Sequence, residues 1–210
     1  MHYKLGLVSD VHATARPLAQ ALELLTEKGV DDIVCLGDIA GYGVELDETV
    51  KLLERYHCQS ILGNHDLWYM QQHEDSPSDY ARQYFTQLPR YYRFKRQDIE
   101  FYCVHANPPD ALMGGIRLYD ENGQLLPQQI SEWTQALQGC DFEFLFVGHT
   151  HQYFDQQLAN TRVINPGSTK FNNSCAMLSL PEQQVDFFSL NGGSLLRSWN
   201  WSKVFANRDT

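Results

Sequence analysis

The sequence predicts an α/β protein in which two packed β-sheets carry helices on their outer faces. Apolar strand-like runs alternate with amphipathic helical segments at the start of the chain, and short strands separated by turns fill the later part. No repeat, low-complexity tract or linker divides the sequence. The length of 210 residues suits one large domain. We therefore expect a single domain over residues 1–210, with a loop excursion around residues 107–127.

The first part of the chain alternates strand and helix. Leucines at helical spacing, with Pro17 in the first turn and Gly29 as a stop, indicate the first helix. The predicted strands span residues 4–9, 32–36 and 60–62, and the predicted helices span residues 17–28 and 46–56. Strand–helix–strand repetition of this kind predicts a parallel core sheet with helices on its faces.

The later part contains more strands than helices. Residues 91–94 and 99–104 flank a polar turn and predict a hairpin. Short helices are expected over residues 79–88 and 131–138, and further strands over residues 142–147, 153–158, 162–164, 176–180 and 184–190. This pattern is typical of an antiparallel or mixed sheet. The tail, residues 198–205, contains Trp199 and Trp201 and has no clear assignment.

Composition indicates a globular protein of the cytoplasm. Hydrophobic residues make up 43% of the chain, and no run of about 20 apolar residues predicts a membrane span. The N-terminus lacks the cationic and apolar regions of a signal peptide. Five scattered cysteines, without a C-x-x-C pair, are expected to be buried thiols in a reducing compartment.

The charge balance restricts the partners. The formal net charge is -10, so an acidic surface would repel duplex nucleic acid. The same charge would repel an anionic substrate unless bound cations reversed it locally.

Five short polar clusters each follow an apolar run. They are Asp10-Val11-His12, Gly37-Asp38-Ile39-Ala40-Gly41, Gly63-Asn64-His65-Asp66, His105, and Gly148-His149-Thr150-His151. Ligands of open α/β sheets bind outside the carboxyl ends of the strands, so these clusters are expected to meet at one rim. Five of the eight histidines fall in them.

The side chains in these clusters suit a pair of divalent cations. Asp, Asn and His without Cys favour Mn, Fe, Zn, Ni or Co. Seven candidate ligands suffice for two cations only if one carboxylate bridges, and Asp38, in the central cluster, is the natural bridge. Two such ions would clamp a phosphoryl group and lower the pKa of a shared water.

The motifs D-x-H, G-D-x-x-G, G-N-H-D, a lone His and G-H-x-H, in this order from Asp10 to His151, resemble the calcineurin-like metallophosphoesterase superfamily. The stretch Val163-Ile164-Asn165-Pro166-Gly167-Ser168 is similar to the small bacterial and archaeal phosphodiesterase branch. The resemblance implies a four-layer αββα sandwich of two mixed sheets flanked by helices. It also implies two divalent metal ions, with manganese expected first and Fe, Zn, Ni or Co as alternatives.

The resemblance assigns roles to individual residues. The implied ligands are Asp10, His12 and His151 for the first metal, Asp38 as the bridge, and Asn64, His105 and His149 for the second. His65 would approach the phosphate, stabilise the transition state and protonate the leaving oxygen. Asp66 would orient His65, or alternatively cap the segment that begins at Leu67.

The function expected from the resemblance is hydrolysis of phosphate esters, with phosphodiesters first, by attack of a hydroxide that bridges the two metals. The substrate would be a small-molecule phosphate ester or a nucleotide, with no membrane partner and with homo-oligomerisation left open. Ile39-Ala40-Gly41-Tyr42-Gly43 has no arginine, and Asp66 stands where protein Ser/Thr phosphatases of the superfamily carry Glu. Both departures disfavour a protein phosphatase.

Other functions remain as alternatives. The chain could be a phosphomonoesterase or a dinucleoside polyphosphate hydrolase. It could also be a non-catalytic metal-binding scaffold like the retromer subunit, although the residues that such relatives lose are all present. A metallo-β-lactamase-type hydrolase is disfavoured, because Gln152 and Tyr153 follow His149-Thr150-His151 where that pattern continues with Asp and His.

Overall fold

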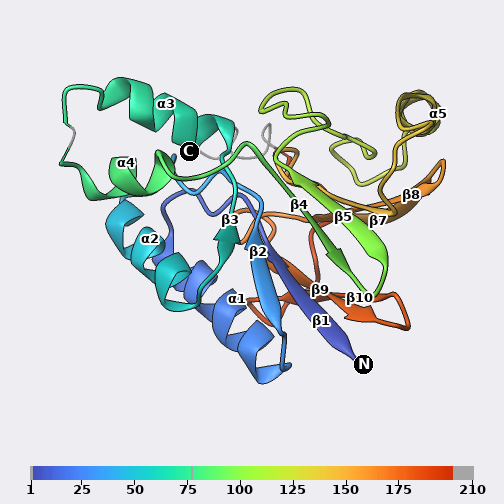
Figure 1. The fold of residues 1–210 in the computed structure, drawn as a ribbon, viewed down its shortest axis with the longest axis horizontal. Coiled ribbons are helices and arrows are strands. Elements are labelled where there is room, and N and C mark those ends of the chain that lie inside the picture. Colours follow the sequence, from blue (N-terminus) through green and yellow to red (C-terminus); the bar gives the residue numbers. More distant parts are fainter. Residues whose placement is uncertain (1, 77, 201–210) are drawn as a thin grey trace, which may run out of the picture.

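The computed structural model describes residues 2–76 and 78–200, which form two five-stranded sheets with helices outside them (Figure 1). The strand order is β10-β9-β1-β2-β3 in the first sheet and β4-β5-β6-β8-β7 in the second. Both sheets are mixed. The first has parallel pairs from β1 to β3 and antiparallel pairs from β1 to β10. The second has parallel pairs at its centre and an antiparallel pair at each edge. The fold class expected from the sequence is confirmed.

The first sheet and its helices come mainly from the N-terminal part. The strands are β1 (Tyr3–Val8), β2 (Asp32–Cys35), β3 (Gln59–Ser60), β9 (Ser174–Leu180) and β10 (Gln184–Ser189). The helices are α1 (Ala15–Glu27), α2 (Leu46–Arg55), α3 (Asn64–Gln72) and α4 (Tyr80–Phe85). The parallel core β1-β2-β3 has the strand–helix–strand connections that the sequence predicts.

The second sheet comes from the middle of the chain. Its strands are β4 (Tyr91–Arg96), β5 (Ile99–Val104), β6 (Phe144–Phe146), β7 (Tyr153–Leu158) and β8 (Thr161–Pro166). The predicted hairpin is β4–β5, and β4 extends two residues further than expected. Gln97 and Asp98 make the turn with positive φ angles of 50° and 64°, the conformation that two-residue hairpins prefer.

The space between the sheets is filled by alternate residues of the strands. Leu5 and Leu7 of β1 point into this inter-sheet core, where they join Phe101 of β5 and Phe144 and Phe146 of β6. Successive strand residues point to opposite faces. Their neighbours in sequence therefore enter the two outer cores, so the inner strands β1, β2 and β6 are buried on both faces.

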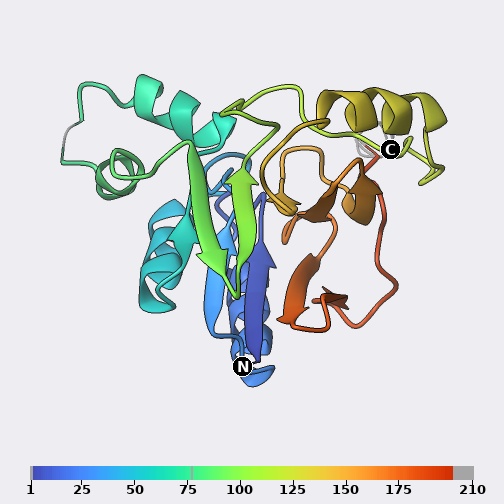
Figure 2. The ribbon, with the colours of Figure 1, turned by 45° about the vertical axis from the view of Figure 1, so that its right-hand side comes forward.

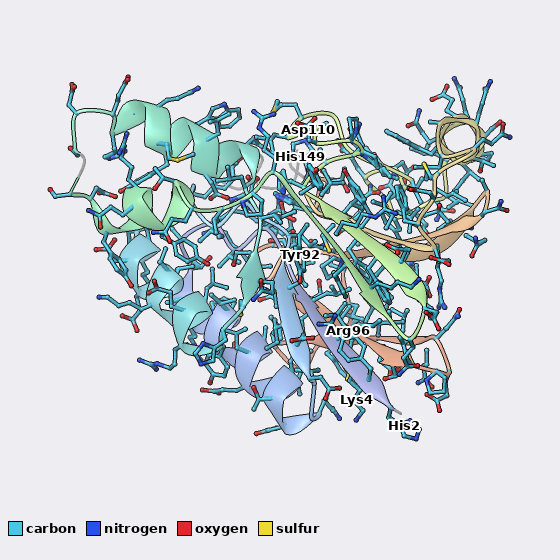
Figure 3. The ribbon with its side chains drawn as sticks, in the orientation of Figure 1. His2, Lys4, Tyr92, Arg96, Asp110 and His149 are labelled. Carbon is cyan, nitrogen blue, oxygen red and sulfur yellow. The ribbon has the colours of Figure 1, made fainter. Side chains whose placement is uncertain are left out.

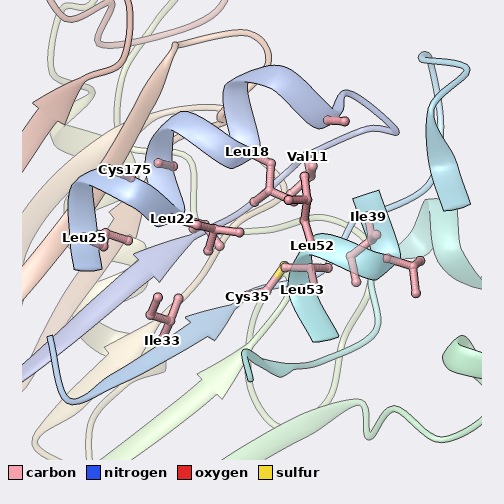
Figure 4. Packing of buried hydrophobic residues seen from close by; sticks show 14 of the residues in the cluster. Val11, Leu18, Leu22, Leu25, Ile33, Cys35, Ile39, Leu52, Leu53 and Cys175 are labelled. Carbon is pink, nitrogen blue, oxygen red and sulfur yellow. The ribbon is translucent and has the colours of Figure 1, made fainter. Parts of the chain in front are cut away.

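The helices α1 and α2 cover the outer face of the first sheet. Leu18, Leu22 and Leu25 of α1 recur at helical spacing and are fully buried against Ile33 and Cys35 of β2 (Figure 4). Both helices lie on the opposite side of the molecule from α5 (Figures 1 and 2).

The outer layer over the second sheet is mostly loop. The helix α5 (Pro127–Ala136) begins earlier than the predicted residue 131, because Pro127 is a favourable first-turn residue. None of its residues is fully buried. Ile116 and Leu118 of the preceding loop are instead buried against the second sheet.

Helix α3 is not among the predicted elements. The run Leu67-Trp68-Tyr69-Met70 is apolar on all sides and gives no helical stripe, and Gly63-Asn64 is typical of a turn.

No helix in the described part of the chain is long and apolar enough to cross a membrane. Residues 201–205 of the unassigned tail, with Trp201, lie outside the described residues.

Replacing Phe101 with alanine is expected to lower the free energy of unfolding by about 3–5 kcal/mol. Phe101 is fully buried and its ring stacks on Phe94, Phe144 and Phe146, so the substitution leaves a cavity between the sheets. Urea denaturation followed by circular dichroism measures the change. The control is Leu125→Ala, which removes a side chain that is 46% exposed, and should cost less than about 0.5 kcal/mol.

Candidate metal centre

All seven predicted ligands lie at one end of the molecule, beyond the carboxyl ends of five strands. Asp10 and His12 follow β1, Asp38 follows β2 and Asn64 follows β3. His105 follows β5, and His149 and His151 follow β6. Figure 3 shows His149 at this end, below the loop that carries Asp110, with Lys4 at the start of β1 far from it. Both sheets therefore contribute to the site.

The ligands form three overlapping groups. Ligand atoms of Asp10, His12 and His151 lie within 4.8 Å of one another, as do those of Asp38, His105 and His149. A third group joins the two, because Asp38 lies within the same distance of His12 and His65. This is the arrangement expected of two adjacent cation sites with a carboxylate between them.

In the first group the ring nitrogens face one another. His12 Nε2 lies 3.0 Å from His151 Nε2, and the latter lies 3.4 Å from Asp10 Oδ1. The other ring nitrogen of His12, Nδ1, donates to the carbonyl oxygen of Ala40 at 3.1 Å. This hydrogen bond fixes the tautomer and leaves the Nε2 lone pair directed at the group, as metal-ligating histidines require.

In the second group a backbone carbonyl oxygen fixes the tautomer of His105 in the same way. Its Nδ1 donates to the carbonyl oxygen of Leu36 at 2.7 Å, and its Nε2 lies 3.3 Å from Asp38 Oδ1. Asn64 Oδ1 lies 3.2 Å from His105 Nε2 and 3.0 Å from His149 Nδ1. Three side-chain types thus direct oxygen and nitrogen atoms at one point.

These donor atoms fit a cation better than they fit one another. Hydrogen bonding alone would favour the opposite orientation of the Asn64 amide, whose nitrogen would then donate to Leu112 O at 3.1 Å and to both rings. With its oxygen toward the rings, Asn64 adds a further acceptor to a group of lone pairs. Asp10 and Asp38 are 0% and 2% exposed. Buried carboxylates of this kind need cationic partners.

The backbone is strained at most of these positions. Asp10, His12, Asp38, His149 and His151 have φ angles between 49° and 65°. Residues other than glycine adopt this left-handed region uncommonly, at a cost of about 1–3 kcal/mol each, and such residues cluster at functional sites. The strain aims five side chains at the same space.

Two glycines permit the loops to approach the carboxylates. A Cβ atom at Gly63 would clash with the amide and carboxylate of Asp38, and one at Gly148 would clash with Ser9 Oγ and lie 2.9 Å from Asp10 Oδ2. Both glycines directly precede a candidate ligand in the sequence, a position that predicts a close approach of the backbone. The absent side chains make room for the carboxylates of neighbouring loops.

The electrostatics couple His105 to Asp38. Burial lowers the pKa of His105, but the charge of Asp38 and their hydrogen bond outweigh it and raise the pKa to about 9. Burial lowers the pKa of His12 to about 3. It also lowers the pKa of His149. In the metal-free protein His105 therefore carries an additional proton at neutral pH.

Hydrogen bonds behind the ligands hold the strained loops in place. Ser9 Oγ donates to Asp10 Oδ2 at 2.7 Å, and Ser168 Oγ donates to the carbonyl oxygen of Asp10 at 2.6 Å. The side-chain nitrogens of Asn165 and Asn172 donate to the carbonyl oxygens of Gly148 and His151 at 2.9 and 3.0 Å. Asn165 and Ser168 belong to the Asn-Pro-Gly-Ser stretch of the sequence, whereas Ser9 and Asn172 lie in none of the sequence motifs.

Asp66 does not orient the His65 ring. Its Oδ1 accepts from the amide of Ala40 at 2.7 Å and its Oδ2 from the amide of Gly63 at 2.9 Å. Asp66 is the third residue of α3 and caps that helix. It thereby ties the loop after Asp38 to the start of α3. Of the two roles considered from sequence, the cap is the one observed, with the cap located at Gly63 rather than before Leu67.

The His65 ring is instead held between aromatic rings. Its centroid lies 4.8 Å from that of Tyr42 and 4.8 Å from that of Trp68, with interplanar angles of 52° and 64°. Its amide donates to Asp38 Oδ1 at 2.9 Å. His65 thus projects beside the two metal groups without joining the ligand contacts of the second one.

A cavity of about 300 Å³ opens at the groups. Its lining is Asp38, Tyr42, Asn64, His65, Trp68, Met113, His149 and His151. Tyr42 also lines a larger cavity of about 860 Å³, whose lining residues include Glu45, Asp47 and Glu48. The smaller cavity is the candidate reaction site, because none of the predicted ligands lines the larger one.

Metal binding at about pH 8 is expected to release about one proton per protein molecule, because His105 must lose its proton to become a ligand. The pKa of His105, about 9, lies above this pH. Metal affinity should therefore weaken as the pH falls below about 9, because the protonated ring cannot bind the metal. Calorimetric titration in two buffers of different ionisation enthalpy measures the release. His105→Gln should reduce the buffer dependence, and identical heats in both buffers for the wild type would contradict the assignment.

Replacing Asp66 with alanine should weaken metal binding about 10–100-fold, since it frees the loops that carry Asp38 and Asn64. The control is Asp79→Ala, which removes a cap of α4 that accepts from the amide of Arg82 at 2.7 Å. That variant should lose about 1 kcal/mol of stability while keeping its metal affinity. Metal titration and thermal denaturation measure both properties. Equal metal affinity in the two variants would refute the role given to Asp66.

The fold is similar to that of known proteins. A 62-residue segment is 39% identical to the uncharacterized protein MJ0912 of Methanocaldococcus jannaschii, covering 30% of this chain and 26% of that relative. The crystal structure of the hypothetical protein PH1004 from Pyrococcus horikoshii OT3 is similar with a TM-score of 0.68 at 20% identity, over 98% of this chain and 92% of the other. An archaeal phosphodiesterase is similar with a TM-score of 0.58 at 17% identity, over 88% and 98%.

The identities to the two solved structures are low, so these similarities concern the fold. The family is shown by the sequence itself, because residues 3–181 match the calcineurin-like phosphoesterase superfamily domain. That match spans the loops that carry all seven candidate ligands, His65 and Asp66. The chain belongs to the calcineurin-like phosphoesterase superfamily.

Proposed function

We propose that this protein hydrolyses phosphodiesters of small molecules with the help of two divalent cations. The observation that carries the proposal is the pair of Asp/His groups joined through Asp38 and open to a cavity that His65 also lines. Asp10, His12 and His151 would hold one cation, and Asn64, His105 and His149 the other, with Asp38 shared. Because both sheets supply ligands, the geometry also supports the expectation of a single domain over residues 1–210.

Two bound cations would supply Lewis-acid polarisation of the phosphoryl oxygens and a nucleophilic water at neutral pH. Oxygen and imidazole ligands accept several first-row metals. Manganese is the proposed metal, and Fe, Zn, Ni or Co are the alternatives.

The chain's own residues supply position and a proton. His65 reaches the cavity from the first turn of α3, where its backbone is fixed by the hydrogen bond to Asp38. Burial lowers its pKa, which makes its protonated form a better acid toward a leaving oxygen. The tautomers of His12 and His105 are set by Ala40 O and Leu36 O, so neither ring needs to reorganise.

The charges around the cavity favour diesters over monoesters. Among the described residues, its lining includes no lysine or arginine. A monoester carries two charges near neutral pH and would lack a side-chain cation for the second one, whereas a diester carries one.

The non-catalytic scaffold remains the second candidate. It would require the loss of a ligand or of the histidine that faces the substrate. Instead, Asp38, Asn64, His149 and His151 line one cavity together with His65. The other candidate ligands, Asp10, His12 and His105, lie within the same groups. This favours an active enzyme.

Replacing His65 with glutamine should reduce kcat for bis-p-nitrophenyl phosphate by about 10²–10⁴-fold while both metals stay bound. The reason is that His65 supplies the proton but no metal bond. Asp38→Asn should instead lose both metal binding and turnover. Release of nitrophenolate and metal content by atomic emission measure the two effects in the Mn²⁺-loaded protein. The matched control is His2→Gln, because the side chain of His2 is 81% exposed. Wild-type turnover in Asp38→Asn would disprove the two-cation site.

A further inference from the structure

We propose that the substrate carries a flat aromatic group on its phosphate, held at the mouth of the cavity by Trp68, Tyr42 and Met113. The inference rests on the proposed function and specifies its substrate class. It concerns the part of the cavity that neither the candidate ligands nor His65 occupy.

The three side chains are apolar and unusually exposed. Trp68, Tyr42 and Met113 are 41%, 56% and 57% exposed, and all three line the cavity beside His65. Large apolar side chains that gather at one exposed place usually mark a binding site. Elsewhere among the described residues, exposed large hydrophobic side chains such as Tyr80 and Leu125 do not line this cavity.

The three side chains come from different segments of the chain that meet at the cavity. Trp68 lies in α3, Tyr42 in the loop after β2, and Met113 in the loop between β5 and α5. The loop that carries Met113 packs closely against the site, because a Cβ atom at Gly115 in this loop would lie 2.8 Å from the ring of His149. A phosphate placed between Asp38 and His149 would therefore have its ester groups directed toward these apolar walls.

The chemistry of the walls specifies what they hold. Aromatic rings and a thioether sulfur favour a flat, polarisable group. The described lining contains no lysine or arginine, so no cationic side chain is available to bind a second phosphate. A volume of about 300 Å³ is at the lower limit of small-molecule sites. A diester with one phosphate and an aromatic group fits, and a dinucleoside polyphosphate chain fits poorly.

Tyr42 and Trp68 also contact the His65 ring, so a test must separate ligand binding from the positioning of His65. Two phosphonates that resist hydrolysis serve as probes: methyl phenylphosphonate and methyl methylphosphonate. Both carry one negative charge and one methyl ester, and they differ only in the ring. Methyl cyclohexylphosphonate adds an apolar group that is not flat.

The Mn²⁺-loaded protein should bind methyl phenylphosphonate about tenfold more tightly than methyl methylphosphonate, as measured by calorimetry. The cyclohexyl compound should fall between them. Trp68→Leu and Met113→Ser should each reduce the phenyl-to-methyl ratio to below about threefold. Tyr80→Leu, an exposed aromatic side chain outside the cavity, should leave the ratio unchanged. Circular dichroism confirms that the variants fold.

Turnover of methyl p-nitrophenyl phosphate is measured in parallel. Equal affinities of the wild type for the two probes, or no measurable binding of the phenyl compound, would overturn the inference. So would a Trp68→Leu variant that loses turnover but keeps the affinity ratio, since Trp68 would then serve only to hold His65. Ring-selective binding without any turnover would instead show that the binding site exists and that the proposed hydrolysis is wrong.

Discussion

The structure depends on gathering buried carboxylates and imidazoles at one edge where two sheets meet. Asp10 and Asp38 are almost inaccessible to solvent, and the ring nitrogens of His12 and His151 lie 3.0 Å apart. A protein interior does not stabilise such a group of acceptors without cations. The acidic chain, with a net charge of -10, has the same requirement when it binds an anionic ester. One pair of ions would satisfy both.

The rest of the fold holds this group in a conformation that the backbone would not choose alone. Five of the seven candidate ligands have positive φ angles, and the hydrogen bonds of Asp66, Ser168 and Asn172 hold their loops. The inter-sheet core, with Phe101 at its centre, keeps the two sheets at a fixed distance. Strain at the site is thereby balanced by packing and hydrogen bonds outside it.

The cavity joins two kinds of surface. One side has the polar groups of Asp38, Asn64 and the histidines, which suit a phosphate. The other side has Trp68 and Met113, which suit an apolar substituent. His65 lies between them, in contact with Trp68 and within reach of Asp38. The side chain proposed to donate the proton is therefore located where the phosphate and its ester group would meet.

Sequence alone determined the class of fold and the identity of the gathered residues. Strand periodicity and the placement of Asp10, Asp38 and His149 just after apolar runs place them at one rim, because parallel strands share their carboxyl ends. Helix α3 could not be predicted, because its apolar residues show no stripe and the Gly63-Asn64 pair at its start is typical of a turn. Only the tertiary structure decided that Asp66 joins two loops and that Tyr42 and Trp68 enclose His65. Trp68 follows His65 by about one helical turn, but Asp66 and Ala40, like Tyr42 and His65, are far apart in the sequence with no period to relate them, so only packing brings them together.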